Sequence, residues 1–257
     1  MNIHIIGGGN LGTALAIGIA NFTKGNKITV TRRNINHIRH LEPLGIKLST
    51  DNKAGIEDSE LIILSIKPYQ VNGVLDEISA FCKGKIVASA VTGLSLEELH
   101  HKMNGGCSII RIMPNIAAQF GESATCLAYA TADDKSGDKV SNLFNQVGSA
   151  VRIEEKLMDA ATVLGACGTA YALRYIRASM QAGIEIGFDA ATALTIASQT
   201  AKGAAKMALE ENVHPEQLID RVTTPQGCTI VGLNEMEHQG FSSALIRGIK
   251  TSLEKIK

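Results

Sequence analysis

The first half of the chain alternates short apolar, β-branched runs with longer segments of helical periodicity. This alternation is typical of a parallel sheet that is covered by helices. Strands are expected at residues 3–6, 27–31, 61–65, 85–89, 108–112, 124–129 and 150–153. Helices are expected between them at residues 11–22, 35–41, 69–81, 96–103 and 133–146. The pattern predicts an α/β fold with a doubly wound, mainly parallel sheet.

The pattern changes after about residue 154. Strand signals stop, and alanine and glycine recur at helical periodicity, with 15 alanines between residues 160 and 208. Helices are expected at residues 156–186, 190–211, 215–222, 225–237 and from 242 to the end. We therefore expect two domains: residues 1–153 with the sheet, and an all-helical domain over residues 154–257.

The charge and composition of the chain bear on which macromolecules it binds. The 257 residues include 25 basic and 25 acidic side chains, so the formal charge is zero. A neutral protein has no long-range field that attracts nucleic acid or anionic lipid. The most apolar long stretch, residues 160–208, is interrupted by charged side chains and is not a membrane span. Neither nucleic acid nor a membrane is expected as a partner.

The five cysteines are scattered along the chain, are odd in number and form no C-x-x-C pair. This usage is typical of a reduced protein without a structural metal. The first strand signal begins at residue 3, which leaves no room for a targeting peptide in this sequence. We expect a cytoplasmic protein and no metal site.

A glycine-rich motif directly follows the first expected strand. Gly7, Gly9 and Gly12 fit the pattern G-x-G-x-x-G, with Asn10 and Leu11 at the start of the first expected helix. In this pattern the first glycine allows a sharp turn, the second admits a pyrophosphate, and the third permits close contact between helix and strand. The motif predicts a dinucleotide site. The alternative is a glycine-rich turn that serves packing alone.

Two arginines follow the second expected strand. Dinucleotide-binding proteins that prefer NAD place an acidic residue there for the ribose hydroxyls, whereas this chain has Arg32 and Arg33. Guanidinium groups suit the 2′-phosphate of NADP. The sequence therefore predicts NADP as the cofactor, with NAD as a weaker one. In the alternative interpretation, one or both arginines only cap a turn in solvent.

Two further strand ends should meet the same edge of the sheet. Lys67 and Pro68 follow the strand at residues 61–65, and Asn115 follows the strand at residues 108–112. Nucleotides bind at the carboxyl edge of doubly wound sheets. Lys67 would place a cation near the cofactor, and Asn115 could offer its amide to the nicotinamide or to the substrate. Each could also be an ordinary loop residue.

The most distinctive segment of the second half is residues 222–229. Thr224 as the N-cap and Pro225 as the first helical residue predict a helix start. The free N–H groups of Gln226, Gly227 and Cys228 would then form a small anion site that suits one carboxylate. Thr229 would place a hydroxyl beside the molecule that carries this carboxylate.

Taken together, these segments resemble pyrroline-5-carboxylate reductases. The resemblance rests on residues 6–12, 66–68, 111–115, 121–122 and 222–229, and it spans residues 3 to about 250. Its most specific part is the spacing from Pro215 and Leu218 to Thr229, which matches the signature of the family in order and spacing.

The resemblance implies an oxidoreductase that acts on CH–NH bonds. It implies that the chain reduces Δ1-pyrroline-5-carboxylate to L-proline with NADPH, in the last step of proline biosynthesis. The substrate carboxylate would be held by the amides of the signature helix, among Thr224, Gln226, Gly227 and Cys228. Thr229 would be the catalytic residue, with its hydroxyl on the ring nitrogen. The family also forms homodimers through the helical domain, and often higher oligomers.

Two departures from the family pattern lie near the implied substrate pocket. Cys167 and Thr169 replace residues of the usual Ser-Gly-Ser-Gly-Pro-Ala, and Gln226 replaces the first glycine of the usual Gly-Gly. A reductase of a related cyclic imino acid therefore stays an alternative, as does a non-catalytic NADP-binding regulator. A β-hydroxyacid dehydrogenase is less favoured, because its catalytic lysine is missing at Leu173.

Overall fold

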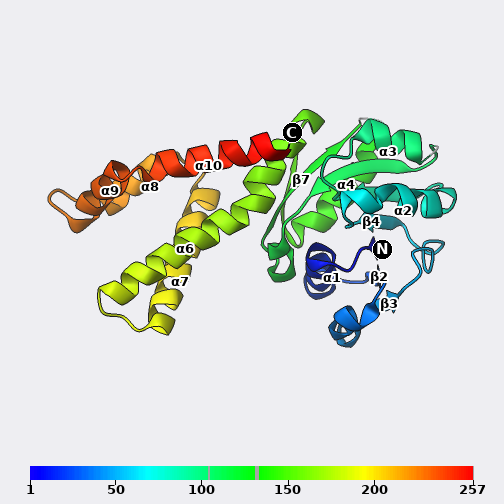
Figure 1. Ribbon diagram of the computed structural model, residues 1–257, viewed down its shortest axis with the longest axis horizontal. Helices are drawn as coiled ribbons and strands as arrows, with labels where there is room; N and C mark the ends of the chain where they lie inside the picture. The colour runs from blue at the N-terminus through cyan, green and yellow to red at the C-terminus, as the bar shows by residue number, and fades with distance from the viewer. Residues whose placement is uncertain (104, 131–132, 257) are drawn as a thin grey trace. The chain divides into compact units, whose positions relative to one another are not determined.

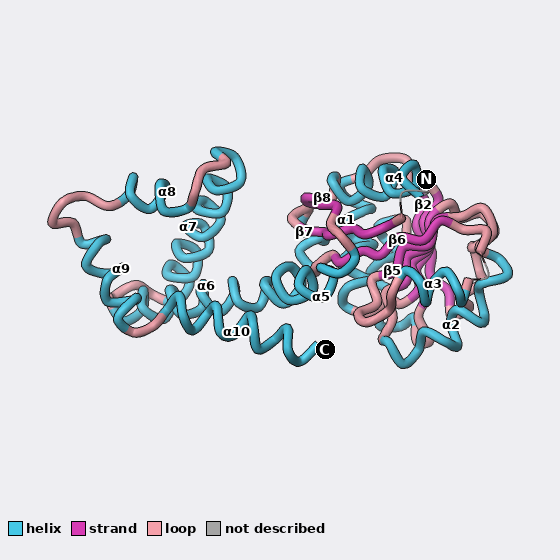
Figure 2. The backbone as a smooth tube through the Cα atoms, turned by 90° about the horizontal axis from the view of Figure 1, so that it is seen from above, coloured by secondary structure: helices cyan, strands magenta, loops and turns pink. Residues whose placement is uncertain are grey.

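The computed structural model describes residues 1–103, 105–130 and 133–256. They form two compact units, Met1–Cys167 and Gly168–Lys255 (Figure 1). All strands of the described chain lie in the first unit, and the second consists of helices and loops (Figure 2). The expected fold class, an α/β unit followed by an all-helical one, is confirmed.

The first unit contains one sheet of eight strands in the order β3-β2-β1-β4-β5-β6-β7-β8. The strands are β1 (Asn2–Ile6), β2 (Lys27–Thr31), β3 (Lys47–Ser49), β4 (Leu61–Leu64), β5 (Ile86–Ser89), β6 (Ser108–Met113), β7 (Ser123–Tyr129) and β8 (Gly148–Arg152). The strands from β3 to β6 pair in parallel, β7 runs antiparallel to β6, and β8 runs parallel to β7. Strand order reverses between β1 and β4, where doubly wound sheets bind ligands.

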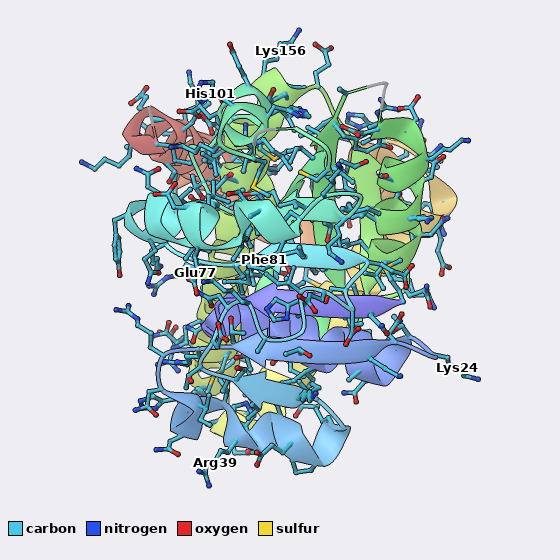
Figure 3. The ribbon with its side chains drawn as sticks, turned by 90° about the vertical axis from the view of Figure 1, so that its right-hand side faces the viewer. Lys24, Arg39, Glu77, Phe81, His101 and Lys156 are labelled. Atoms are coloured by element: carbon cyan, nitrogen blue, oxygen red, sulfur yellow. The ribbon has the colours of Figure 1, made fainter. Side chains whose placement is uncertain are left out.

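Helical segments cover both faces of the sheet and bury its side chains. They are α1 (Asn10–Phe22), η1 (Ile35–Leu44), η2 (Pro68–Gln70), α2 (Val71–Ile78), η3 (Ser79–Phe81), α3 (Leu96–Lys102), η4 (Ile116–Phe120) and α4 (Asp134–Asn145). One apolar cluster joins β1 to Leu15 of α1 and Phe144 of α4. A second cluster, on Ile6 and Leu64, includes α2 and α3. Charged side chains such as Lys24 and Arg39 point outward (Figure 3).

The segment after β8 differs from the single helix expected at residues 156–186. It consists of η6 (Glu155–Leu157), α5 (Met158–Ala161), a π-helical segment Thr162–Cys167, and α6 (Gly168–Glu185). Met158 and Ala166 pack against β6 and β7 in a third apolar cluster. The last residues of the first unit are therefore part of its core.

The second unit contains α6, α7 (Ala190–Glu211), α8 (Pro215–Val222), α9 (Cys228–His238) and α10 (Phe241–Ile256). Asp189 caps α7, with its carboxylate 3.0 Å from the N–H groups of Ala191 and Thr192. Tyr171 of α6 and Ser252 of α10 form a 2.7 Å hydrogen bond. Within the described part of the chain, no helix combines the length and apolarity that crossing a membrane requires.

Candidate functional site

The turn after β1 is held by the ends of two neighbouring strands. The N–H groups of Gly7 and Gly8 donate to the carbonyl oxygen of Thr31, at 3.1 and 2.8 Å. Gly7 has a φ of 109°, and a Cβ there would lie 2.2 Å from the carbonyl oxygen of Ser65, after β4. Both the conformation and the close approach require glycine at this position.

Helix α1 packs directly against this turn. A Cβ on Gly12 would lie 2.0 Å from the carbonyl oxygen of Gly7, so the first turn of the helix can approach only without a side chain there. Gly9 differs from both: its φ is −82°, and a Cβ on it would meet no atom within 4 Å. The fold itself therefore does not require glycine at residue 9, and its small size leaves open space at the start of α1.

The start of α1 suits an anion. Gly9 is the N-cap and offers no side chain to the first N–H groups, and the first turn holds no acidic residue. Gly9 and Asn10 are exposed, and Leu11 is half-buried. The free N–H groups and the positive end of the helix dipole favour a phosphate in the space beside Gly9. These residues fit the diphosphate of a dinucleotide.

The two arginines after β2 have different surroundings. Arg32 is half-buried, its N–H donates to Ser49 at 3.0 Å, and its Nη1 donates to the carbonyl oxygen of Gly8 at 2.6 Å. Arg33 is exposed, and its guanidinium contacts no partner among the residues that the structure describes. Arg33 can therefore bind an external anion without breaking an internal contact.

Lys67 lies at the carboxyl edge of β4 and is exposed. Its N–H donates to Oε1 of Gln70 at 3.2 Å, and Pro68 is the first residue of η2. The N–H of Ser65 donates to the carbonyl oxygen of Ile6 at 2.8 Å, which ties this loop to the glycine turn. Because β1 and β4 are parallel neighbours, Lys67 follows the same edge of the sheet as Gly9.

Asn115 is nearly buried and has several internal partners. Its Oδ1 accepts from the N–H of Ala117 at 3.0 Å, and its Nδ2 donates to the carbonyl oxygen of Gly165 at 3.2 Å. Its own N–H donates to Oγ of Ser123 at 3.0 Å. The side chain thus caps η4 and connects the end of β6 to the π-helical segment. These contacts account for asparagine at this position without a ligand.

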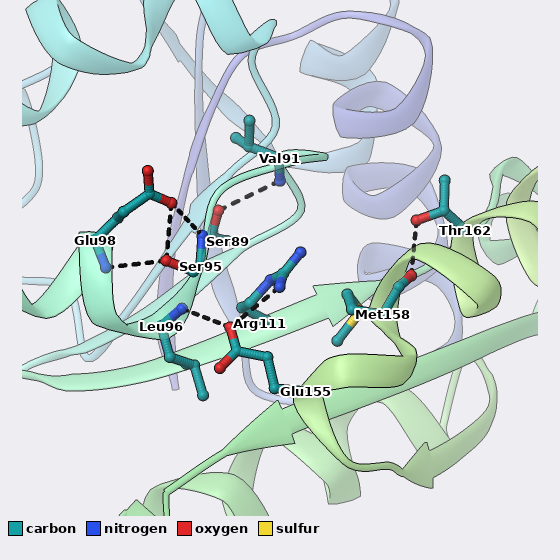
Figure 4. A network of polar contacts seen from close by, with 9 residues as sticks. All are labelled: Ser89, Val91, Ser95, Leu96, Glu98, Arg111, Glu155, Met158 and Thr162. Atoms are coloured by element: carbon teal, nitrogen blue, oxygen red, sulfur yellow. Dashed lines mark hydrogen bonds and ion pairs between the residues drawn. The ribbon is translucent and has the colours of Figure 1, made fainter. Parts of the chain in front are cut away.

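A partly buried ion pair joins β6 to the segment after β8 (Figure 4). Nη1 of Arg111 lies 3.1 Å from Oε1 of Glu155, and the same oxygen accepts from the N–H of Leu96 at 2.6 Å. Ser95 and Glu98 form a capping box at the start of α3, and hydrogen bonds from Ser95 hold the pKa of Glu98 below its ordinary value. The S-x-x-E spacing was a signal for this cap, whereas nothing in the sequence pairs Arg111 with Glu155.

The sequence patterns also did not predict a polar network beneath the glycine turn. His4 on β1 is fully buried, and its Nε2 donates to the carbonyl oxygen of Asn52 at 3.0 Å. The Asn52 side chain accepts from the Thr31 hydroxyl at 2.8 Å and donates to Glu77 at 2.9 Å. Nδ1 of His4 has no hydrogen-bond partner among the residues that the structure describes, and burial lowers the pKa of this histidine. Thr31 connects the network to the turn, because its carbonyl holds Gly7 and Gly8.

The segment before α9 is a turn rather than the expected first turn of a helix. The N–H of Gly227 donates to the carbonyl oxygen of Thr224 at 2.9 Å, and Gln226 has a φ of 62°. This is the pattern of a type II turn, which an α-helix cannot contain. The prediction of Thr224 as the N-cap and of a helix from residue 225 is therefore wrong. Gly227 is the N-cap, and α9 begins at Cys228.

The later start of α9 changes which backbone N–H groups are free to bind an anion. The N–H of Gly227 is used inside the turn, so the open groups of the helix start are those of Cys228 and the residues that follow it. A Cβ on Gly227 would lie 2.6 Å from Oγ1 of Thr224 and 3.0 Å from its carbonyl oxygen, so a larger residue there would have to displace the Thr224 side chain. Thr229, the second residue of α9, is exposed, as are Thr224, Gln226 and Cys228.

Comparisons with known proteins match one family model to each half of the chain and find relatives over its whole length. The family described as pyrroline-5-carboxylate reductase dimerisation matches residues 155–257, and that described as NADP oxidoreductase, coenzyme F420-dependent, matches residues 2–93. Pyrroline-5-carboxylate reductase 1 of Dictyostelium discoideum is 42% identical over 98% of this chain, which spans 49% of that protein. Pyrroline-5-carboxylate reductase 2 of the same organism is 41% identical, with 99% of this chain and 91% of that protein covered.

Solved structures give the same result. The pyrroline carboxylate reductase of Plasmodium falciparum, crystallised with NADP bound, is 26% identical and has a TM-score of 0.88, with 100% of this chain and 97% of that chain covered. The 3-hydroxyisobutyrate dehydrogenase of Mycobacterium tuberculosis is 9% identical and has a TM-score of 0.56, with 73% of this chain and 66% of that chain covered. The second likeness concerns the fold alone.

Proposed function

The chain belongs to the pyrroline-5-carboxylate reductase family, and from this premise we propose that it reduces Δ1-pyrroline-5-carboxylate to L-proline, the last step of proline biosynthesis. The observation that carries the proposal is the similarity to a reductase at 41% identity, over 99% of this chain and 91% of that protein. NADPH is the proposed reductant, with NAD(H) as a weaker cofactor. When bound, the nicotinamide supplies the hydride that reduces the C=N bond.

The first unit provides the groups that hold this cofactor. The open space beside Gly9 and the amides at the start of α1 suit the diphosphate. Arg33, which is exposed and has no partner within the described ranges, suits the 2′-phosphate. Lys67 adds a cation at the same edge of the sheet. Asn115 stays a proposed neighbour of the nicotinamide, although its described contacts are internal.

The second unit provides the groups for the substrate. The free amides from Cys228 onward, at the positive end of α9, would bind the carboxylate of the imino acid. Thr224, Gln226 and Gly227 shape the turn in front of these amides. The Thr229 hydroxyl, on the first turn of α9, would accept from or donate to the ring nitrogen. A protonated cyclic imine is already electrophilic, so binding and orientation supply most of the catalysis.

The proposed partner in assembly is a second copy of the chain. Large apolar side chains on all five helices of the second unit are exposed in a single chain, among them Leu173, Leu194, Val222, Val231 and Ile246. Exposed apolar surface on this scale favours a protein interface. A homodimer through residues 155–257 agrees with the family match, and a higher oligomer is compatible with it. The free cysteines agree with a cytoplasmic location.

Two other functions stay open. A reductase of a related cyclic imino acid is favoured by Gln226 and by Cys167 and Thr169, where this chain departs from the family pattern. A non-catalytic NADP-binding regulator would bind the cofactor through the first unit without reducing any substrate. An assay of NADPH and NADH against five- and six-membered cyclic imino acids separates all three. Fastest turnover with NADPH and the pyrroline supports the proposal, and cofactor binding without any turnover supports the regulator.

Replacement of Thr229 tests the substrate site directly. We expect Thr229→Ala to lower kcat/KM for the pyrroline at least tenfold, because the group that orients the ring nitrogen is lost. NADP⁺ binding, measured by titration calorimetry, should stay unchanged. Thr251→Ala, on exposed α10, is the matched control and should keep full turnover. Unchanged turnover in Thr229→Ala would remove this residue from the site.

A further inference from the structure

Both backbone polar groups of Gly8 are held by residues at the end of β2. Its N–H donates to the Thr31 carbonyl at 2.8 Å, and its carbonyl accepts from Nη1 of Arg32 at 2.6 Å. Gly8 is buried, and a Cβ on it would lie within 3.3 Å of the side chains of Ile38 and Val30. Arg32 thus satisfies a carbonyl that has no described backbone donor.

The carbonyl of Gly8 and the N–H of Gly9 belong to one planar peptide unit. In a trans peptide these two groups point in opposite directions, so a donor that fixes the oxygen also fixes the direction of the Gly9 N–H. That N–H has no acceptor among the described residues and borders the open space beside Gly9. A guanidinium on the oxygen also polarises the peptide and strengthens the N–H as a donor.

We propose that Arg32 is a positioning residue for the cofactor diphosphate, which acts through the Gly8–Gly9 peptide, and that Arg33 alone selects for the 2′-phosphate. The inference rests on the proposed cofactor. The sequence pattern predicts that both arginines bind the 2′-phosphate; the inference gives this role to Arg33 and a different one to Arg32. Because NAD and NADP share the diphosphate, Arg32 supports both cofactors equally, and only Arg33 distinguishes them.

The two roles predict different binding patterns in the full-length protein. Arg32→Met keeps the side-chain stem and removes the donors, and we expect it to weaken NADP⁺ and NAD⁺ alike, by about tenfold, as for a hydrogen bond to a charged group. Arg33→Met should weaken NADP⁺ by about tenfold or more and change NAD⁺ less than twofold. Both dissociation constants are measured by titration calorimetry.

A second measurement needs no cofactor. Amide hydrogen exchange of the free protein should be faster at Gly8, whose N–H is bonded to Thr31, in Arg32→Met, because the turn loses its contact with Arg32, and unchanged in Arg33→Met. Arg32→Lys retains one cationic donor and should restore part of the affinity for both cofactors. Circular dichroism and thermal unfolding show whether each variant is folded.

The outcomes separate the inference from the proposed function. If Arg32→Met, or Arg32→Lys where the first does not fold, weakens NADP⁺ and spares NAD⁺, Arg32 is a phosphate ligand and the inference is overturned. Unchanged affinity for both cofactors also overturns it. If the unaltered protein binds neither cofactor, the proposed function itself fails, whatever the arginine variants show.

Discussion

His4 gives the stability of the protein a dependence on pH. Burial disfavours the charged imidazolium, since Nδ1 has no partner in the described part of the chain, and this lowers the pKa of His4 in the folded state, although the bond to Asn52 and the charge of Asp51 act in the opposite direction. The unfolded chain therefore binds a proton more readily than the folded one. The free energy of unfolding should be highest above pH 6.5 and should fall as the pH drops toward the folded pKa.

Replacement of His4 tests this dependence. His4→Gln keeps an amide donor for the carbonyl of Asn52 and cannot be protonated in this range. We expect the loss of stability between pH 7 and pH 5 to be smaller in His4→Gln than in the unaltered protein, as measured by urea unfolding at each pH. His37→Gln, at an exposed site, is the control and should leave the slope unchanged. Equal slopes in all three proteins would contradict this role of His4.

Gln226 occupies a backbone conformation that glycine adopts more easily. Its φ of 62° costs a residue with a side chain about 1 kcal/mol. Gln226→Gly should therefore raise the free energy of unfolding by several tenths of a kcal/mol, since part of the gain is lost to the greater freedom of the unfolded chain. Gln199→Gly, at an exposed site inside α7, should instead lower it by about 1 kcal/mol. Urea unfolding measures both changes. Destabilisation by Gln226→Gly would contradict the left-handed conformation of residue 226 as a source of strain.

Single residues also show how far the sequence could predict the site. Gly7, Gly9 and Gly12 could be identified from their spacing, because Gly7 and Gly12 each meet a steric condition of the turn between strand and helix, and Gly9 stands where a pyrophosphate approaches in this pattern. The contact between Arg32 and Gly8 could not, since the direction of a long side chain depends on neighbours from other elements. The left-handed conformation of Gln226 was hidden because glutamine carries no conformational signal of that kind.

At the scale of elements, Asn115 links the end of β6 to the π-helical segment. π-Helical segments pair backbone groups five residues apart instead of four, and Nδ2 of Asn115 donates to the carbonyl oxygen of Gly165 in this segment. Asn115→Ala removes this donor and the cap of η4, and should lower the free energy of unfolding by about 1 to 3 kcal/mol. Asn115→Ser keeps a capping oxygen and loses only the donor, so its loss should be smaller. If urea unfolding shows that Asn115→Ser is as strongly destabilised as Asn115→Ala, the cap of η4 makes no separate contribution to stability.

The elements that were predicted incorrectly share a physical cause. The helix expected at residues 156–186 is broken because contacts with β6 and β7 decide its local form, and helical periodicity does not report such contacts. The helix expected from residue 225 begins at Cys228, because the hydrogen bond between Gly227 and Thr224 closes a turn first. Strand β3 has only three residues and no apolar run, so no pattern could indicate it.

At the scale of the whole molecule, the alternation of apolar runs and helical periods was sufficient to predict an α/β unit and a helical one. Parallel strands buried on both faces give continuous apolar runs, and β4 and β5 are buried throughout. The helical unit was recognised by its small residues, but its exposed apolar side chains are visible only in the structure. A single sequence does not show which helix faces a single chain leaves uncovered.

The order of the strands in the sheet matches the order in which a ribosome releases them. The first three strands extend the sheet in one direction from β1, and then β4 is added on the other side of β1. From there each strand up to β8 joins the edge formed by the strand synthesised just before it. A nascent chain can therefore build this sheet outward, one strand after another, and no strand waits for a partner made later in the helical half.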